Sequence, residues 1–277
     1  RMTTSAILSR ITRHGVFERY FPNCPAFIVR TRYGARFVEA NSLTSVNSAR
    51  EAHWGQTLSV LGELGLPPEY SLETVDGPAE IADVVRDLAA NFSFDEHVEW
   101  AATAMAFYLP PRDRWTDKFG RTYSFDEVVS HFTRRRLGEG ASCAGTHVLF
   151  TLAVILQVDR RERVLSSASR EMARSFLKRA AVTLTAAQES GGAWTANWAG
   201  SSDLAPLFRN RLDRVWITGH HLDWMAIADD ELRVNNDRLL AAGRFVISSV
   251  LRADDDEVAR NPCPYTHGVR AVARLTW

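Results

Sequence analysis

The stretch that decides the fold is CAGTHVLFTLAVIL, residues 143–156, in which Cys143 and His147 lead directly into a long apolar run. A helix that is apolar on every side is expected to be buried on every side. The pattern that opens this run, Cys-x-x-Thr-His, returns at Cys263-Pro264-Tyr265-Thr266-His267. Two copies of one helix-start pattern predict a helical repeat.

The repeat extends along the chain with a constant spacing. It separates His53 from Trp100, Trp100 from His147, and His220 from His267 by 47 residues each. His147 and His220 are 73 residues apart, which is one period plus an insertion of 26 residues. A period in the forties is typical of units that contain two helices.

Two kinds of helix alternate within this period. Nearly all-apolar segments predict buried inner helices at residues 53–65, 98–109, 146–156, 220–228 and 267–275. Amphipathic segments with many charges predict outer helices at residues 79–91, 125–137, 162–188 and 235–252. The alternation predicts a mostly α fold, namely an α/α toroid or an open arc of about five helical hairpins.

The N-terminal residues have a different pattern. Residues 4–20 fit one amphipathic helix, and β-rich segments at 26–32 and 35–40 flank Tyr33-Gly34, which predicts a β-hairpin. We therefore expect an N-terminal extension over residues 1–41 and a toroid domain over residues 42–277. From residue 42 onward we expect only helices and loops.

Composition excludes several classes of protein. The 277 residues contain 33 Lys+Arg and 33 Asp+Glu, so the formal net charge is zero. A neutral chain gives no electrostatic reason to expect a nucleic-acid partner. The three cysteines do not suit a disulfide scaffold, and no apolar run is long enough for a transmembrane segment. A cytoplasmic location is expected. Because Arg1 precedes Met2, a leader or anchor removed from the N-terminus is left open.

One local motif links the chain to a known fold. Gln188-Glu189-Ser190-Gly191-Gly192-Ala193-Trp194 has the form Gln-x-x-x-Gly-x-Trp. It resembles the Gln–Trp repeat of the terpenoid-cyclase and protein-prenyltransferase superfamily. The resemblance implies an α/α toroid over residues 42–277 and says more about fold than about activity.

Polar residues at the starts of the inner helices suggest a metal site. In a toroid these starts gather at one mouth of the central cavity, and thiolate and imidazole are preferred zinc ligands. The predicted ligands are Cys143, His147, Cys263 and His267. Protein prenyltransferases and the lanthionine cyclases, which are also toroids, bind zinc in this way. However, their Asp-x-Cys and Cys-His-Gly motifs are missing from this chain.

Metal-free acid/base chemistry is a second interpretation, with His220, His53 and Asp223 as candidate catalytic residues. Gly219-His220-His221-Leu222-Asp223 is similar to the Gly-His-x-Ile-Glu segment of sugar epimerases with α/α barrels. Sugar rings stack on aromatic faces, so the candidate substrate-binding residues are Trp54, Trp100, Trp194, Trp198 and Trp224. A third interpretation takes the repeated pentads as helix-start packing signals only.

These interpretations leave three functions open. The first is an enzyme-like toroid with a Cys/His cluster, with or without zinc, that acts on a small molecule or peptide in its cavity. The second is a non-catalytic repeat module that binds a protein or peptide. The third is a carbohydrate-active barrel. Whether the chain is catalytic is left open by the sequence.

Overall fold

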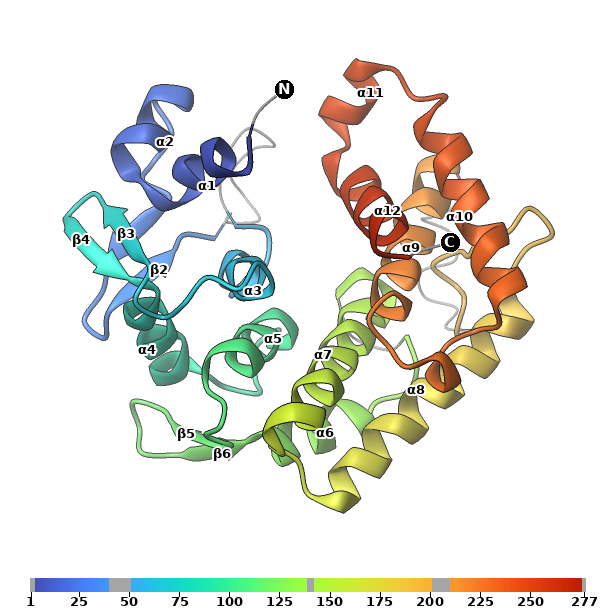
Figure 1. The fold of residues 1–277 in the computed structure, drawn as a ribbon, viewed down its shortest axis with the longest axis horizontal. Helices are drawn as coiled ribbons and strands as arrows, with labels where there is room; N and C mark the ends of the chain where they lie inside the picture. Colours follow the sequence, from blue (N-terminus) through green and yellow to red (C-terminus); the bar gives the residue numbers. More distant parts are fainter. Residues whose placement is uncertain (1–2, 40–50, 139–141, 201–209, 276–277) are drawn as a thin grey trace. The chain divides into compact units, whose positions relative to one another are not determined.

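The computed structural model describes residues 3–39, 51–138, 142–200 and 210–275. These residues are mostly helical, as the sequence predicts, and form two compact units, Arg1–Phe125 and Asp126–Trp277. Figure 1 shows the elements of both units. No helix among the described residues is long and apolar enough to cross a membrane.

The first unit contains helices and small hairpins. Its helices are α1 (Thr4–Thr12), α2 (His14–Tyr20), α3 (Gln56–Glu63), α4 (Ile81–Asn91) and α5 (Glu99–Tyr108). Its strands are β1 (Ile28–Arg30), β2 (Ala35–Phe37), β3 (Ser71–Thr74), β4 (Gly77–Glu80), β5 (Arg114–Thr116) and β6 (Thr122–Ser124). The strands pair in chain order as three antiparallel hairpins, with Val29 opposite Arg36 in the first.

The predicted N-terminal hairpin is confirmed, but two other expectations for this unit are wrong. Residues 4–20 form two helices, because Arg13 is extended and bridges Glu73. The expectation of helix and loop only from residue 42 onward missed β3–β4 and β5–β6. Their sequence signals are short, such as the turn dipeptide Asp76-Gly77 between β3 and β4.

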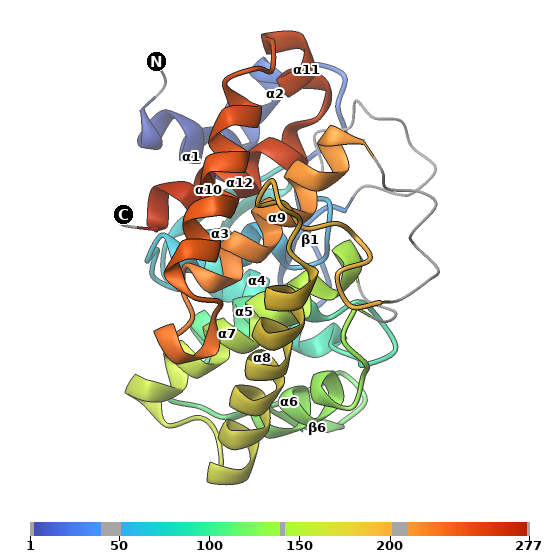
Figure 2. The same cartoon turned by 90° about the vertical axis from the view of Figure 1, so that its right-hand side faces the viewer.

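The second unit is built from long helices. They are α6 (Phe125–Thr133, whose first residue ends the first unit), α7 (Thr146–Glu162), α8 (Ser167–Ala187), α9 (Arg211–Met225), α10 (Asn236–Val250), α11 (Asp255–Arg260) and α12 (Pro262–Arg274). Short 3-10 turns, η1 (Ser142–Gly145) and η3 (Asp230–Leu232), precede α7 and α10. Helix α9 packs against both α7 and α12, while α8 packs on α7 and α10 packs on α9 and α12 (Figures 1 and 2).

Several predicted helix boundaries in this unit are wrong; α12, for example, begins at Pro262 rather than at residue 267. Helix α8 begins at Ser167 rather than at residue 162, because α7 continues to Glu162 and ends where Arg163 is left-handed. Helix α9 begins nine residues before His220, where Asn210 and Asp213 form a capping box. His220 therefore lies in the interior of a helix and not at its start.

Candidate metal centre

Three buried histidines from three helices meet inside the second unit. His147 comes from the first turn of α7, His220 from the interior of α9 and His267 from α12, and their exposed fractions are 3%, 3% and 8%. The ring centroids of His220 and His267 are 3.7 Å apart, and that of His147 lies 5.3 Å and 6.4 Å from them. One ring nitrogen of each lies within 4.8 Å of the other two, so this cluster, the histidine triad, can hold a metal ion.

Close packing of α9 on α12 brings two of these rings together. A Cβ added to Gly219 would lie 2.7 Å from the backbone nitrogen of Gly268, so the two backbones are in direct contact there. His220 stacks on His267, and Asp223 bonds to Arg270, each pair being one 47-residue period apart. The second pair lies three residues after the first in both helices, so the helices run parallel. The spacing of the repeat therefore sets which residues of α9 and α12 face each other.

Hydrogen bonding leaves one nitrogen of His220 available. Its Nδ1 lies 2.8 Å from the carbonyl oxygen of Trp216, and because a carbonyl only accepts, Nδ1 carries the proton. Nε2 then presents a lone pair, and among the described residues it has no hydrogen-bond partner. Burial, together with the neighbouring His267 and His147, holds the pKa of His220 well below its usual 6.5, which keeps the ring neutral.

A carboxylate orients the second ring. Nδ1 of His267 donates to Oδ2 of Asp223 at 3.1 Å, which leaves Nε2 of His267 for a ligand. Asp223 is 2% exposed, and it also accepts hydrogen bonds from Arg270 (Nε, 3.0 Å) and Arg274 (Nη1, 3.1 Å). A carboxylate behind a histidine is the arrangement that fixes the tautomer and orientation of metal ligands.

Cys143 lies beside the third ring. Its sulfur is within 4.8 Å of a ring nitrogen of His147. The residue sits in a left-handed turn with φ of 52°, followed by Ala144 at 55°. Thr146 donates to the Cys143 carbonyl at 2.7 Å, and the indole of Trp198 donates to the Ala144 carbonyl at 3.0 Å. These bonds hold a strained backbone directly before α7.

Cys263, the matching cysteine of the second pentad, is placed differently. The residue is exposed, and among the described residues it belongs to no group of three potential ligands. Desolvation raises the pKa of its thiol, against the opposing effect of a hydrogen bond with Trp216. The structure thus brings together His147, His267 and the candidate acid/base residue His220, with Cys143 near His147 and Cys263 apart from the triad.

The remaining predicted residues separate into two groups. His53 and Trp54 line a cavity of about 400 Å³ in the first unit, while Trp100 is 3% exposed in α5. Trp194, Trp198 and Trp224 are at most 3% exposed in the second unit and surround His221. These three rings have the placement of core residues. Their role in binding a substrate stays a prediction.

Sequence reasoning missed the groups that lie behind the triad histidines. Arg270 and Arg274 follow His267 at spacings of three and seven, which places all three side chains on one face of α12. That spacing was a signal that could have found them. The backbone contact of Trp216 with His220 carries no side-chain signal, because it uses a carbonyl oxygen.

Comparison of the chain with protein-family models, with curated proteins and with solved structures found no match. The functional argument therefore starts from the geometry of the histidine triad.

Proposed function

We propose that this chain is a zinc enzyme in which His147, His220 and His267 hold the metal. The observation that carries the proposal is the buried Nε2 of His220, which is neutral, lacks a hydrogen-bond partner among the described residues and lies within ligand reach of two other imidazoles. A buried polar atom of this kind costs about 1–3 kcal/mol unless something binds it. A metal ion would satisfy all three rings at once.

Three protein ligands are typical of a catalytic zinc site and not of a structural one. Structural zinc sites are closed by four protein ligands, whereas catalytic sites have three and keep one position for water. Bound zinc would lower the pKa of such a water toward neutrality and supply a nucleophile for hydrolysis or hydration of a small molecule or peptide. Asp223 would orient His267, and Trp216 would fix the tautomer of His220.

The α/α toroid belongs to the same proposal. In the second unit α7 is followed by α8, and α9 by α10, with α7, α9 and α12 as the helices that carry the triad. This order of helices supports the alternation of inner and outer helices that a ring or arc requires.

The first test is zinc binding by chelator-washed protein. We expect one zinc ion per chain, and at least ~100-fold weaker binding in His220→Ala, more than the loss typical when a residue that only orients a ligand is changed. His131→Ala, on α6, is the matched control and should bind as the parent does. Absence of zinc binding, or equal binding by His220→Ala, would refute the proposal.

Cobalt substitution tests whether the fourth position is open. A thiolate ligand gives Co²⁺ an intense near-ultraviolet charge-transfer band, and three histidines with water do not. We expect no such band, together with zinc-dependent hydrolysis of p-nitrophenyl acetate that His220→Ala abolishes. A band that disappears in Cys143→Ser and survives in Cys263→Ser would show a closed, structural site and overturn the catalytic part.

A further inference from the structure

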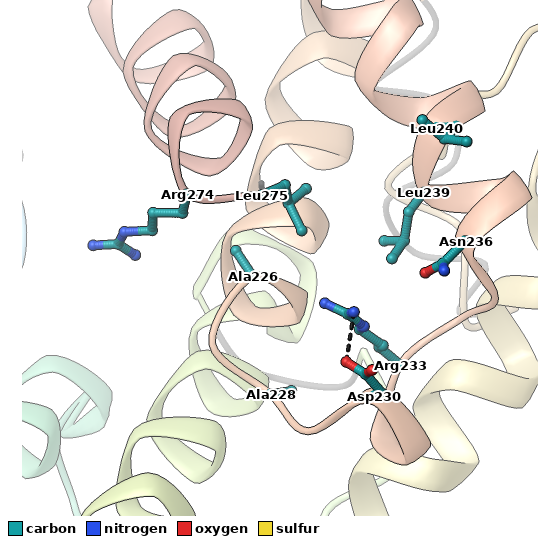
Figure 3. A pocket seen from close by; sticks show the side chains of 9 residues that line it. All are labelled: Ala226, Ala228, Asp230, Arg233, Asn236, Leu239, Leu240, Arg274 and Leu275. Carbon is teal, nitrogen blue, oxygen red and sulfur yellow. Dashed lines mark ion pairs between the residues drawn. The ribbon is translucent and has the colours of Figure 1, made fainter. Parts of the chain in front are cut away.

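A second cavity lies in the same unit, beyond the triad. Its volume is about 450 Å³, within the range of small-molecule sites. It lies among the end of α9, the segment that leads into α10, and the end of α12 (Figure 3). The proposal for this cavity is independent of whether the triad binds zinc.

Apolar side chains line opposite sides of the cavity. Leu239 of α10 and Leu275 at the end of α12 point toward one another across it in Figure 3. Ala226 and Ala228 are small and leave room beside them. A ligand that fills this space would gain from burying a short apolar body, by roughly 25 cal/mol for each Å² removed from water.

Arg233 supplies a polar anchor in the middle of the cavity. Its side chain is only 19% exposed, whereas its partner, Asp230, is 90% exposed. Nη2 of Arg233 lies 2.5 Å from Oδ1 of Asp230. The guanidinium thus already holds a carboxylate, and an exposed ion pair of this kind is worth only about 0–1 kcal/mol. A ligand carboxylate can replace Asp230, which then turns into solvent.

The other charges around the cavity are mixed. Arg274 also lines it, but its guanidinium donates to Asp223 and points away from the cavity in Figure 3, so Arg233 is the cation available to a ligand. The carbonyl ends of α9 and α12 oppose an anion, but Arg233 faces the Met225 carbonyl at 3.5 Å and Arg274 lies in the last turn of α12. Asn236 adds the N-terminal end of α10, which is favourable to negative charge.

We infer that this cavity binds a small monocarboxylate with a short apolar body, with the carboxylate on Arg233 and the body between Leu239 and Leu275. Arginine suits this role because its planar fork bonds both oxygens of a carboxylate. The apolar side chains select against inorganic anions, and the guanidinium selects against neutral molecules of the same size.

The test is calorimetric titration of metal-free protein with hexanoate, with 1-hexanol and inorganic phosphate as matched probes. We expect saturable binding of one hexanoate and no comparable binding of the other two. Arg233→Gln should weaken hexanoate binding by about 10–100-fold, the value of a charge-assisted hydrogen bond. Arg244→Gln, an exposed arginine on α10 that does not line the cavity, should leave it unchanged.

A second variant keeps the test decisive if Arg233→Gln does not fold. Asp230→Asn removes the competing carboxylate from an exposed site and should tighten hexanoate binding by about 2–5-fold. Asp237→Asn, at the exposed start of α10, controls for a general change of charge. Equal binding of 1-hexanol, equal binding of phosphate, or no tightening by Asp230→Asn would overturn the inference. None of these outcomes bears on zinc binding.

Discussion

His220 and His221 are neighbours on α9, yet they belong to two different regions of the second unit. His220 lies in the histidine triad, with its Nδ1 on a carbonyl oxygen. His221 is enclosed by Trp194, Trp198 and Trp224, which we call the tryptophan cage. Successive helical residues point about 100° apart, so one helix serves both regions.

The two rings differ in which nitrogen is protonated. The indole of Trp224 donates to Nδ1 of His221 at 3.2 Å, so the proton of this ring is on Nε2. His220 has the opposite tautomer and presents a lone pair at Nε2. Burial lowers the pKa of both residues, that of His221 to about 3. Burial and a lowered pKa therefore do not distinguish His220 from His221, whereas the hydrogen-bond partner of Nδ1 does.

The largest expected effect comes from breaking the cage. Trp194→Ala removes a ring that is fully buried and donates to the Leu184 carbonyl at 2.9 Å. We expect the free energy of unfolding to fall by about 3–5 kcal/mol, measured by urea denaturation. The folded fraction should still bind zinc. Trp54→Ala, at a half-buried site, is the control and should cost less. Loss of zinc binding without loss of stability would mean that the two regions are not separate.

A buried carboxyl in the first unit extends the comparison. Glu51 is 4% exposed, and burial raises its pKa to about 8 despite bonds from the Gly55 and Thr57 backbone. Because the folded state then binds a proton more tightly than the unfolded state, stability falls as pH rises from about 4.5 to about 8.

Replacing this carboxyl should remove that loss. By pH 7 the fall in the free energy of unfolding amounts to about 3 kcal/mol, since one pKa unit corresponds to about 1.4 kcal/mol. Both oxygens of Glu51 accept a backbone N–H, and the amide nitrogen of Gln cannot, so we expect Glu51→Gln to be less stable than the parent at pH 4.5. Between pH 4.5 and pH 8 the variant should lose less stability than the parent, measured by urea denaturation at both values. An unchanged pH slope would show that the bonds from the backbone outweigh burial.

The smallest effect separates orientation from ligation within the triad. Asp223→Asn keeps the shape of the side chain but removes the charge behind His267. Zinc affinity should fall by about 10–100-fold, less than for His220→Ala, as measured by competition with a chelator. Asp213→Asn, at the exposed start of α9, is the control. A loss as large as that of His220→Ala would mean that Asp223 holds α12 in place rather than orienting one ring.

The spacing of 47 residues was the most informative sequence signal. It predicts a helical repeat. In the structure, residues 47 apart contact each other between α9 and α12, namely His220 with His267 and Asp223 with Arg270. The mostly helical fold and the N-terminal hairpin are confirmed. Short hairpins such as β3–β4 were missed, because four-residue strands carry too little pattern to compete with a helical interpretation.

The residues that gather in the cluster were harder to predict than the fold. The repeated pentad gives Cys143 and Cys263 equal weight, although one lies beside His147 and the other is exposed. What separates them is local backbone, namely a left-handed turn before α7 and a proline-led first turn in α12. His220 was predicted at a helix start. Its tautomer depends on a carbonyl one turn earlier, which no side-chain motif records.

The concentration of contacts on Asp223 has a kinetic consequence. His267, Arg270 and Arg274 all approach this one carboxylate from α12. His267 therefore reaches the other two imidazoles only when α12 is packed in place, and a bound ion would hold that helix there. The rate of metal binding would then depend on how fast α12 packs against the unit, and metal release would require α12 to separate from it. Slow exchange would then coexist with only moderate equilibrium affinity.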